Sequence, residues 1–285
     1  MVFIIGPPRS GSTLLMQTLT DAYDVGYLTN RHCRWFGAPA LAERLYNPLG
    51  DKSPSDFQSN YGRTKKPSDP AECGAWWYRF FRRQPAYVTR GEVSERKMRA
   101  FSRSIASLQN TSGKPLIFKN LYASLRLDPM SVYLPEALYI VIERDLKDNA
   151  ESILKGRKDA LGSYQHWWSV PPPNVGALDE LSPVQQAVGQ IESIHELIDR
   201  DIERLGLEDR VFRVSYEDFC EDVHGTLYRF QDFMARHGIE LERRFEVPYR
   251  FEIEHSQKIP QDMYEELGDY VDQRNKGKEN QGTRA

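Results

Sequence analysis

A chain of 285 residues can bury a substantial core, either as one large domain or as two small ones. Hydrophobic residues make up 40% and charged residues 28%, and the net charge of −3 lacks the basic excess typical of nucleic-acid binding. Three widely spaced cysteines match neither a disulfide framework nor a zinc motif, and no apolar run reaches membrane-spanning length. We therefore expect a cytoplasmic protein without a transmembrane segment, nucleic-acid partner or metal.

The first predicted elements are a short buried strand over 2–5 and a helix over 12–22, joined by a turn of Gly, Pro and Ser residues. A second strand is predicted over 25–28 and a helix over 38–46. The stretch 51–70 is polar and rich in Pro, Ser and Gly. A loop of that length inside a compact domain is usually functional or disordered.

Helices are predicted next over 71–83 and 94–108, followed by a short apolar strand over 116–118. The segment 138–142 reads LYIVI, a β-branched and aromatic run typical of an interior parallel strand. A helix from 146 to about 158 follows it.

In the C-terminal part, Ser182 and Pro183 form an N-cap and first-turn pair for a helix that extends to 205. A fifth strand is predicted over 211–214 and a helix over 223–236. The polar tail 276–285 is predicted to fray.

Strands that alternate with helices indicate a parallel sheet covered on both faces. We predict an α/β fold with a P-loop-like central parallel sheet of about five strands. The simplest organisation is a single domain over 1–275 with inserted segments at about 30–110 and 159–182.

The sequence GPPRSGST at 6–13 follows a predicted strand and opens a predicted helix, the context of a phosphate-binding loop. Its backbone N–H groups and the helix dipole would converge on an anion. Ser12 occupies the position of the lysine in nucleotide kinases, and a basic residue appears earlier, as Arg9. A transferring sulfuryl group carries less charge than a phosphoryl group, so Arg and Lys can neutralise it without Mg²⁺. The alternative is a structural turn made tight by its glycines.

The loop resembles the 5′-phosphosulfate loop of the sulfotransferases that use 3′-phosphoadenosine 5′-phosphosulfate (PAPS), in the Pro-Arg-Ser-Gly form of carbohydrate and many bacterial members. The segment 140–154 resembles the family's 3′-phosphate segment, with Arg144 at the end of a strand and Ser152 eight residues later. Residues 118–120 fall where relatives carry a Lys-Thr pair, and 214–219 resembles a Tyr-Glu-Asp segment. Four ordered segments make the resemblance specific.

This resemblance implies that PAPS is the sulfate donor, that adenosine 3′,5′-bisphosphate is the product and that no metal is required. It places Arg9 and Lys119 near the transferring sulfate. Tyr216 and Glu217 are interpreted as structural. The residues implied to bind the donor, with a C-terminal lysine chosen on spacing, are Pro8, Arg9, Ser10, Gly11, Ser12, Thr13, Leu14, Arg144, Ser152 and Lys258.

Structural alternatives exist for the donor residues. Arg144 could pair with a neighbouring aspartate, Ser152 could be a helix-surface serine, and Lys119 could be a solvated lysine.

All tryptophans lie outside the donor segments, beside polar and Pro-rich stretches. As a group they predict the wall of an acceptor cleft, although each could equally belong to the core. They are Trp35, Trp76, Trp77, Trp167 and Trp168.

Sulfuryl transfer to a hydroxyl needs a base near the acceptor oxygen. The resemblance does not supply it, because Leu121 replaces the histidine that relatives carry after the Lys-Thr pair. Glu72, beside a tryptophan pair, and His32, after the first helix, are the two candidates. Their alternatives are a helix-terminal glutamate and a surface histidine.

The sequence leaves three function classes open. The first is the sulfotransferase, acting on a small-molecule, lipid or carbohydrate acceptor. The second is a magnesium-dependent kinase or NTPase, and the third is a nucleotide-binding protein without catalysis. The sequence does not indicate the oligomeric state.

Overall fold

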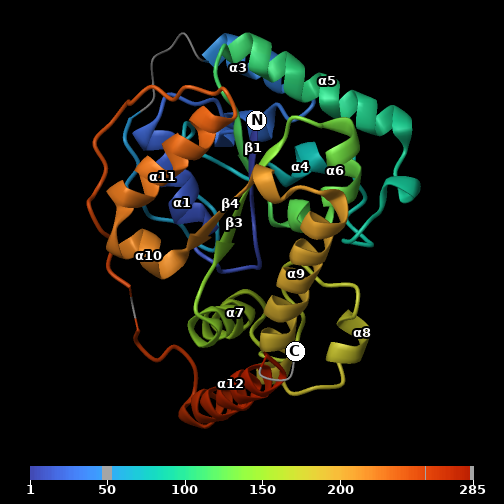
Figure 1. The fold of residues 1–285 in the computed structure, drawn as a ribbon, viewed down its shortest axis with the longest axis vertical. Helices are drawn as coiled ribbons and strands as arrows, with labels where there is room; N and C mark the ends of the chain where they lie inside the picture. The colour runs from blue at the N-terminus through green and yellow to red at the C-terminus, as the bar shows by residue number, and fades with distance from the viewer. Residues whose placement is uncertain (47–52, 254, 283–285) are drawn as a thin grey trace.

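The computed structural model describes residues 1–46, 53–253 and 255–282, and a parallel sheet forms its centre (Figure 1). The strand order is β2-β1-β3-β4, and every pairing is parallel. The strands are β1 (Val2–Ile5), β2 (Ile117–Lys119), β3 (Leu138–Glu143) and β4 (Val211–Ser215).

The predicted second strand, 25–28, extends the sheet at the β2 edge through one parallel bridge. There the Gly26 amide donates to the Pro115 carbonyl at 2.8 Å, and the Ile117 amide donates to the Gly26 carbonyl at 2.9 Å. All five predicted strand segments therefore contribute, and the α/β prediction with about five parallel strands is confirmed.

The strands are apolar on both faces because helices cover both. Val2 and Ile4 of β1 face a cluster with α1 and α11, while Phe3 faces a cluster with α5, α6 and α9. Figure 1 shows these helices on opposite sides of the sheet. The helices of the first layer are α1 (Ser12–Ala22), α10 (Tyr216–Glu221) and α11 (Val223–Arg236), and those of the second include α5 (Glu95–Ser112), α6 (Leu127–Tyr133) and α9 (Pro183–Leu205).

A third cluster packs α7 against α9 and the C-terminal helix at the lower end of Figure 1. The helices here are α7 (Leu146–Leu161), α8 (Val175–Leu178) and α12 (Gln261–Gly282). The remaining helices are short, namely α2 (Asn30–Arg34), α3 (Pro39–Tyr46), α4 (Gly74–Trp77) and the 3₁₀ turns η2 (Arg90–Glu92), η3 (Leu121–Leu125) and η4 (Glu208–Arg210).

Several helices begin and end where the sequence predicts them. Ser182 forms a capping box with Gln185 at the start of α9, and α1 and α11 have their predicted bounds. The predicted helix 71–83 is wrong, since only one turn forms there. Cys73 adopts a left-handed conformation (φ 49°) just before this turn, so no helix can run through it.

The tail expected to fray is instead helical as far as Gly282, as part of α12. Residues 283–285 lie outside the described residues, as do 51 and 52 of the long polar stretch.

The remainder of that stretch, 53–70, is an ordered loop bound to α1. Gln17 donates to the Ser55 hydroxyl at 2.9 Å, and the Asp21 carboxylate accepts from the Ser55 amide at 2.6 Å. The other end is held by Asn30, which donates to the Lys66 carbonyl at 2.9 Å. No helix within the described part of the chain is long and apolar enough to cross a membrane.

Candidate functional site

The turn between β1 and α1 has backbone conformations that its sequence explains. Gly11, the residue before α1, has φ 89°, and an added Cβ would lie 2.1 Å from Cδ2 of Tyr216. Glycine is therefore required both for the left-handed conformation and for the close approach of the ring. No side chain caps the first turn of α1, so its N–H groups remain available to an anion.

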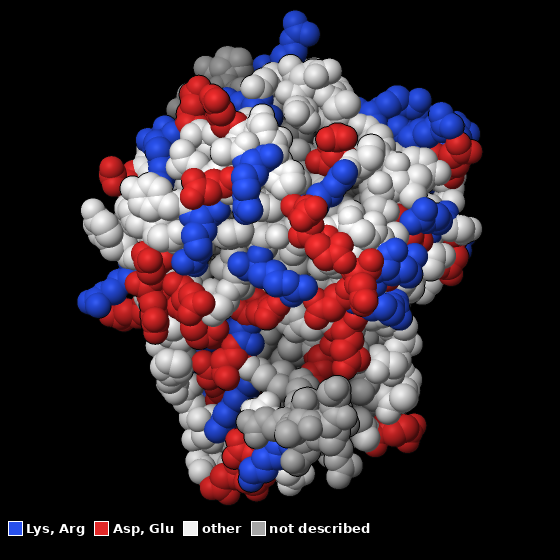
Figure 2. Space-filling view, viewed as in Figure 1, with Lys and Arg blue, Asp and Glu red and all other residues white. Residues whose placement is uncertain are grey.

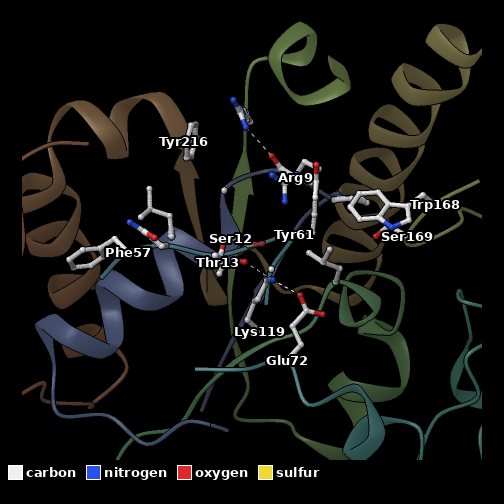
Figure 3. Close-up of a pocket in the computed structure, with 18 residues that line it drawn as sticks. Arg9, Ser12, Thr13, Phe57, Tyr61, Glu72, Lys119, Trp168, Ser169 and Tyr216 are labelled. Carbon is white, nitrogen blue, oxygen red and sulfur yellow. Dashed lines mark hydrogen bonds and ion pairs between the residues drawn. The ribbon is translucent and has the colours of Figure 1, made fainter. Parts of the chain in front are cut away.

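This turn borders a cavity of about 600 Å³, with Phe57 and Trp168 on opposite sides and Lys119 and Glu72 between them (Figure 3). Most of the predicted donor residues of the turn line it, namely Pro8, Arg9, Gly11, Ser12, Thr13 and Leu14.

Ser10 differs from the other residues of the turn. Its side chain is fully buried and points towards Gly6, because the turn curls it inward. The predicted role of Ser10 in donor binding would therefore rest on its backbone, and it stays a prediction.

A second cavity of about 510 Å³ adjoins the first and shares Arg9, Tyr61, Arg144 and Tyr216 with it. It brings together the three residues that the sequence assigned to the 3′-phosphate, and these are Arg144, Ser152 and Lys258. Residues more than 100 positions apart thus meet as predicted. Their role as phosphate ligands stays a prediction.

The two arginines are positioned by aromatic rings and by each other. Arg144 donates to the Arg9 carbonyl at 3.2 Å, and its guanidinium carbon lies 4.7 Å from the centre of the Tyr216 ring. Arg9 donates to the Ser152 hydroxyl at 3.0 Å and lies 4.9 Å from the centre of the Tyr61 ring. None of these is an acidic partner, so both cations can meet an anion.

Burial changes the proton affinity of these groups. It lowers the pKa of Arg9, although the guanidinium remains charged at neutral pH, and it raises the pKa of Tyr216 to about 12. The phenol of Tyr216 is therefore neutral at physiological pH and offers a hydrogen-bond donor rather than a negative charge.

Lys119 connects the two sides of the first cavity. The last residue of β2, it pairs in register with Ile4, which places its side chain beside the turn after β1. Its ammonium donates to the Thr13 hydroxyl at 2.9 Å and forms an ion pair with the Glu72 carboxylate (Figure 3). A basic side chain from β2 therefore occupies the region that the missing loop lysine would serve.

Trp76 and Trp77 do not form an acceptor wall, which corrects the prediction. Both are fully buried, and Trp76 stacks on Phe118 with ring centres 5.6 Å apart. The Trp77 indole N–H donates to the Glu72 carbonyl at 3.1 Å. Both rings pack in the hydrophobic core against Phe118 of β2, and they support the backbone that carries Glu72.

Of the other three tryptophans, one lines the first cavity and two do not. Trp168 lines the first cavity, with its ring edge-on to Tyr61 at 5.6 Å, and Gly156 of α7 makes room for it. Trp167 instead covers Arg157, 5.1 Å from the ring centre. Trp35 is 40% exposed and contacts Tyr46, outside these cavities, so its predicted acceptor role is not supported.

His32 is a structural residue, which corrects its prediction as a base. Its Nδ1 accepts from the Thr29 amide at 3.1 Å in the capping box of α2, and its Nε2 lies 3.3 Å from a Glu43 carboxylate oxygen. The side chain is 3% exposed and lines neither cavity. An acceptor cannot reach it.

Several residues that line the cavities were not identified from the sequence, and two of them are aromatic. Phe57 and Tyr61 lie in the 53–70 loop, and the Tyr61 hydroxyl donates to the Asp159 carboxylate across the second cavity. Only the length and polarity of the loop signalled them. Tyr216 was interpreted as structural, yet it lines both cavities, whereas Glu217 does accept a backbone hydrogen bond, from Asp145 at 3.1 Å.

Acidic residues suited to a metal are sparse around the turn. Glu143, at the end of β3, pairs with Arg213 at 2.8 Å and lines neither cavity. Among residues 1–46, 53–253 and 255–282, no group of three or more His, Cys, Asp or Glu could hold a metal ion.

Comparison with known proteins agrees with this geometry. The model of the sulfotransferase family matches residues 2–242. No curated protein matches the sequence significantly.

Among solved structures, the chain is similar to a sulfotransferase from Mycobacterium avium, with 16% identity, a TM-score of 0.52, and coverage of 95% of this chain and 76% of the other. It is similar to a sulfotransferase from Mycobacterium tuberculosis, with 15% identity, a TM-score of 0.50, and coverage of 85% and 68%. At these identities the likeness concerns the fold.

Proposed function

Because the chain belongs to the sulfotransferase family, we propose that it transfers a sulfuryl group from PAPS to a hydroxyl or amine of a small-molecule, lipid or carbohydrate acceptor. The products are the sulfated acceptor and adenosine 3′,5′-bisphosphate. No metal is needed, because the cavities are rich in cationic groups.

The two adjoining cavities fit a donor with separate anionic ends. The open first turn of α1, together with Arg9, holds the 5′-phosphosulfate end. Arg144, Ser152 and Lys258 hold the 3′-phosphate in the second cavity. Arg9 and Arg144 are half-buried, and none of their contacts described above is with an acidic side chain, so an anion that meets them would lower the cost of their partial burial, which supports this assignment.

The reacting groups are Lys119 and Glu72. Negative charge grows on the leaving phosphate oxygen as its bond to sulfur breaks, and Lys119, bonded to Thr13 of the loop, stabilises that charge. Glu72 takes the proton of the acceptor hydroxyl. Its side chain is 34% exposed and lines the cavity, so an acceptor can reach it.

The single observation that carries the proposal is the position of the Lys119 ammonium. It contacts both the phosphate-binding turn and the only carboxylate that lines the first cavity, within the described residues. A donor in the turn and an acceptor beside Glu72 would meet at this ammonium.

The kinase alternative is less well supported. A magnesium-dependent enzyme needs a carboxylate that is available to the metal near the phosphates. Glu143, at the end of β3, faces Arg213 instead, and Glu72 in the first cavity is paired with Lys119. A nucleotide-binding protein without catalysis would not need Glu72 paired with Lys119.

Binding of nucleotides in EDTA tests the donor assignment. We expect calorimetry to detect adenosine 3′,5′-bisphosphate without metal, and to detect ATP with Mg²⁺ only weakly. The reverse order of affinities would contradict the proposal. Turnover of labelled PAPS with a panel of alcohols and sugars then distinguishes an enzyme from a binding protein.

A further inference from the structure

The turn that follows α2 and the helix α3 carry a group of exposed apolar side chains that the proposed reaction does not use. We call it the α2–α3 patch. Its members are Trp35 (40% exposed), Phe36 (41%), Leu41 (47%) and Leu45 (50%). Large hydrophobic side chains exposed elsewhere on the described residues, such as Tyr228 and Tyr249, lie far from this stretch in sequence. Single exposed residues are ordinary, whereas a group marks an interaction surface.

The exposure is not forced by the helix, because α3 already has an inner face. Ala42 and Glu43 are buried there, and α3 packs along α5. Leu41 and Leu45 are four residues apart and thus lie on one outward stripe. Trp35 and Phe36 extend this stripe in the turn before the helix, where Arg79 fixes the chain by donating to the Phe36 carbonyl at 3.0 Å.

The same end of the molecule is basic. Helices α2, α3 and α5 together contain seven Lys and Arg but only two Glu, in a chain whose net charge is −3. Of the two glutamates, Glu43 faces His32 in the interior and Glu95 pairs with Arg99. Exposed basic residues of these helices include Arg34, Arg44, Arg96, Lys97 and Arg103.

Figure 2 shows basic side chains at the top and upper right, where Figure 1 places α5, beside uncharged surface, and an acidic group at the upper left. Aromatic and aliphatic side chains surrounded by arginine and lysine are the composition of proteins that bind membranes at the interface. We propose that the α2–α3 patch docks on the surface of an anionic lipid bilayer. Trp35 and Phe36 enter the headgroup region while the basic residues meet lipid phosphates.

A second protein copy fits this patch less well. A stable protein interface takes about 20–30 residues from each side. The α2–α3 patch has four apolar side chains beside the exposed Arg34 and Arg44, and two identical surfaces of that kind would bring like charges together.

Docking would also orient the candidate site. Cys33 of α2 lines a recess of about 400 Å³ that reaches Glu72, and α2 leads directly into Trp35 of the patch, so the patch adjoins the acceptor side of the site. The surface binding itself does not depend on the proposed reaction and can be tested without it.

The test is co-sedimentation with vesicles of phosphatidylcholine alone or mixed equally with phosphatidylserine. We expect the full chain to bind the mixed vesicles, less as salt is raised, because the attraction to the surface is screened. The double variant Trp35→Ser/Phe36→Ser and the double variant Arg34→Glu/Arg44→Glu should each lower the partition coefficient by about tenfold or more. Tyr228→Ser/Tyr249→Ser is the matched control and should bind like the wild type.

Thermal unfolding of each variant checks that the fold persists. Equal binding of wild type and patch variants, or no preference for the anionic vesicles, would overturn the proposal. So would sedimentation velocity that shows a dimer abolished by the Trp35→Ser/Phe36→Ser variant, because the patch would then be a protein interface. Retained binding of bisphosphate in the patch variants keeps this result separate from the donor assignment.

Discussion

Replacing Arg144 with alanine should separate two nucleotides that differ by one phosphate. The guanidinium lies in the second cavity with Ser152 and Lys258, and we assign that cavity to the 3′-phosphate. AMP lacks this phosphate but keeps the 5′-phosphate and the adenosine. Arg144→Ala should therefore weaken binding of adenosine 3′,5′-bisphosphate much more than binding of AMP.

The magnitude follows from the contacts. A charge-assisted hydrogen-bonded contact is worth about 1.5–3 kcal/mol, which corresponds to a loss of about 10-fold to 150-fold in affinity for the bisphosphate. The substitution also removes the stack on Tyr216 and the hydrogen bond to the Arg9 carbonyl. Those losses affect both nucleotides, so the ratio of the two dissociation constants isolates the 3′-phosphate contact.

Calorimetry with both ligands in EDTA measures this ratio. Arg213→Ala is the matched control, because Arg213 is half exposed on the neighbouring strand and pairs with Glu143 and Asp199 outside both cavities. The control should leave both affinities unchanged. Equal weakening of both nucleotides by Arg144→Ala would refute the assignment.

Two further predictions concern the chemical step. Lys119→Ala should lower kcat by about 100-fold or more, with the dissociation constant of adenosine 3′,5′-bisphosphate nearly unchanged, since the ammonium acts mainly on charge that develops in the transition state. An equal rise in that dissociation constant would make Lys119 a binding residue. Glu72→Gln should lower kcat most strongly for poorly acidic acceptor hydroxyls, whereas His32→Ala should lower the Tm and leave kcat nearly unchanged, because His32 caps α2. Full turnover in Glu72→Gln would place the base elsewhere.

The fold was predictable because strand and cap signals are local. The run LYIVI over 138–142 is apolar and β-branched, and the Ser182 and Pro183 pair starts α9 as expected. The helix over 71–83 failed for a reason that periodicity does not show, namely the left-handed conformation of Cys73. The C-terminal helix was missed because 261–282 is mostly polar and packs along one side only.

The residues assigned to the donor lie together in the structure, whereas most of those assigned to the acceptor do not. Arg144 and Ser152 were assigned through the family resemblance and Lys258 on spacing alone. All three line the second cavity, where the Lys258 amide donates to Glu151 of α7. The positions of the tryptophans in the sequence could not distinguish residues that line an acceptor cleft from residues of the hydrophobic core. Trp76 belongs to the core, because its ring stacks on Phe118 of β2. Tyr61 comes from a loop whose path depends on hydrogen bonds to α1 that have no sequence signature.

The placement of the reactive ammonium on β2 has a consequence for how activity depends on folding. A lysine within the phosphate-binding loop would be positioned by the loop itself. Lys119 instead contacts the turn after β1 only because β2 pairs with β1 in the correct register. A shift of one residue in this register would turn the Lys119 side chain to the opposite face of the sheet, and it would move Phe118 from the cluster with α5, α6 and α9 to the face covered by α1 and α11. Turnover therefore depends on the correct register between β1 and β2, which are more than a hundred residues apart in sequence. Molecules with a shifted register would lack catalytic activity even if the turn between β1 and α1 were correctly formed.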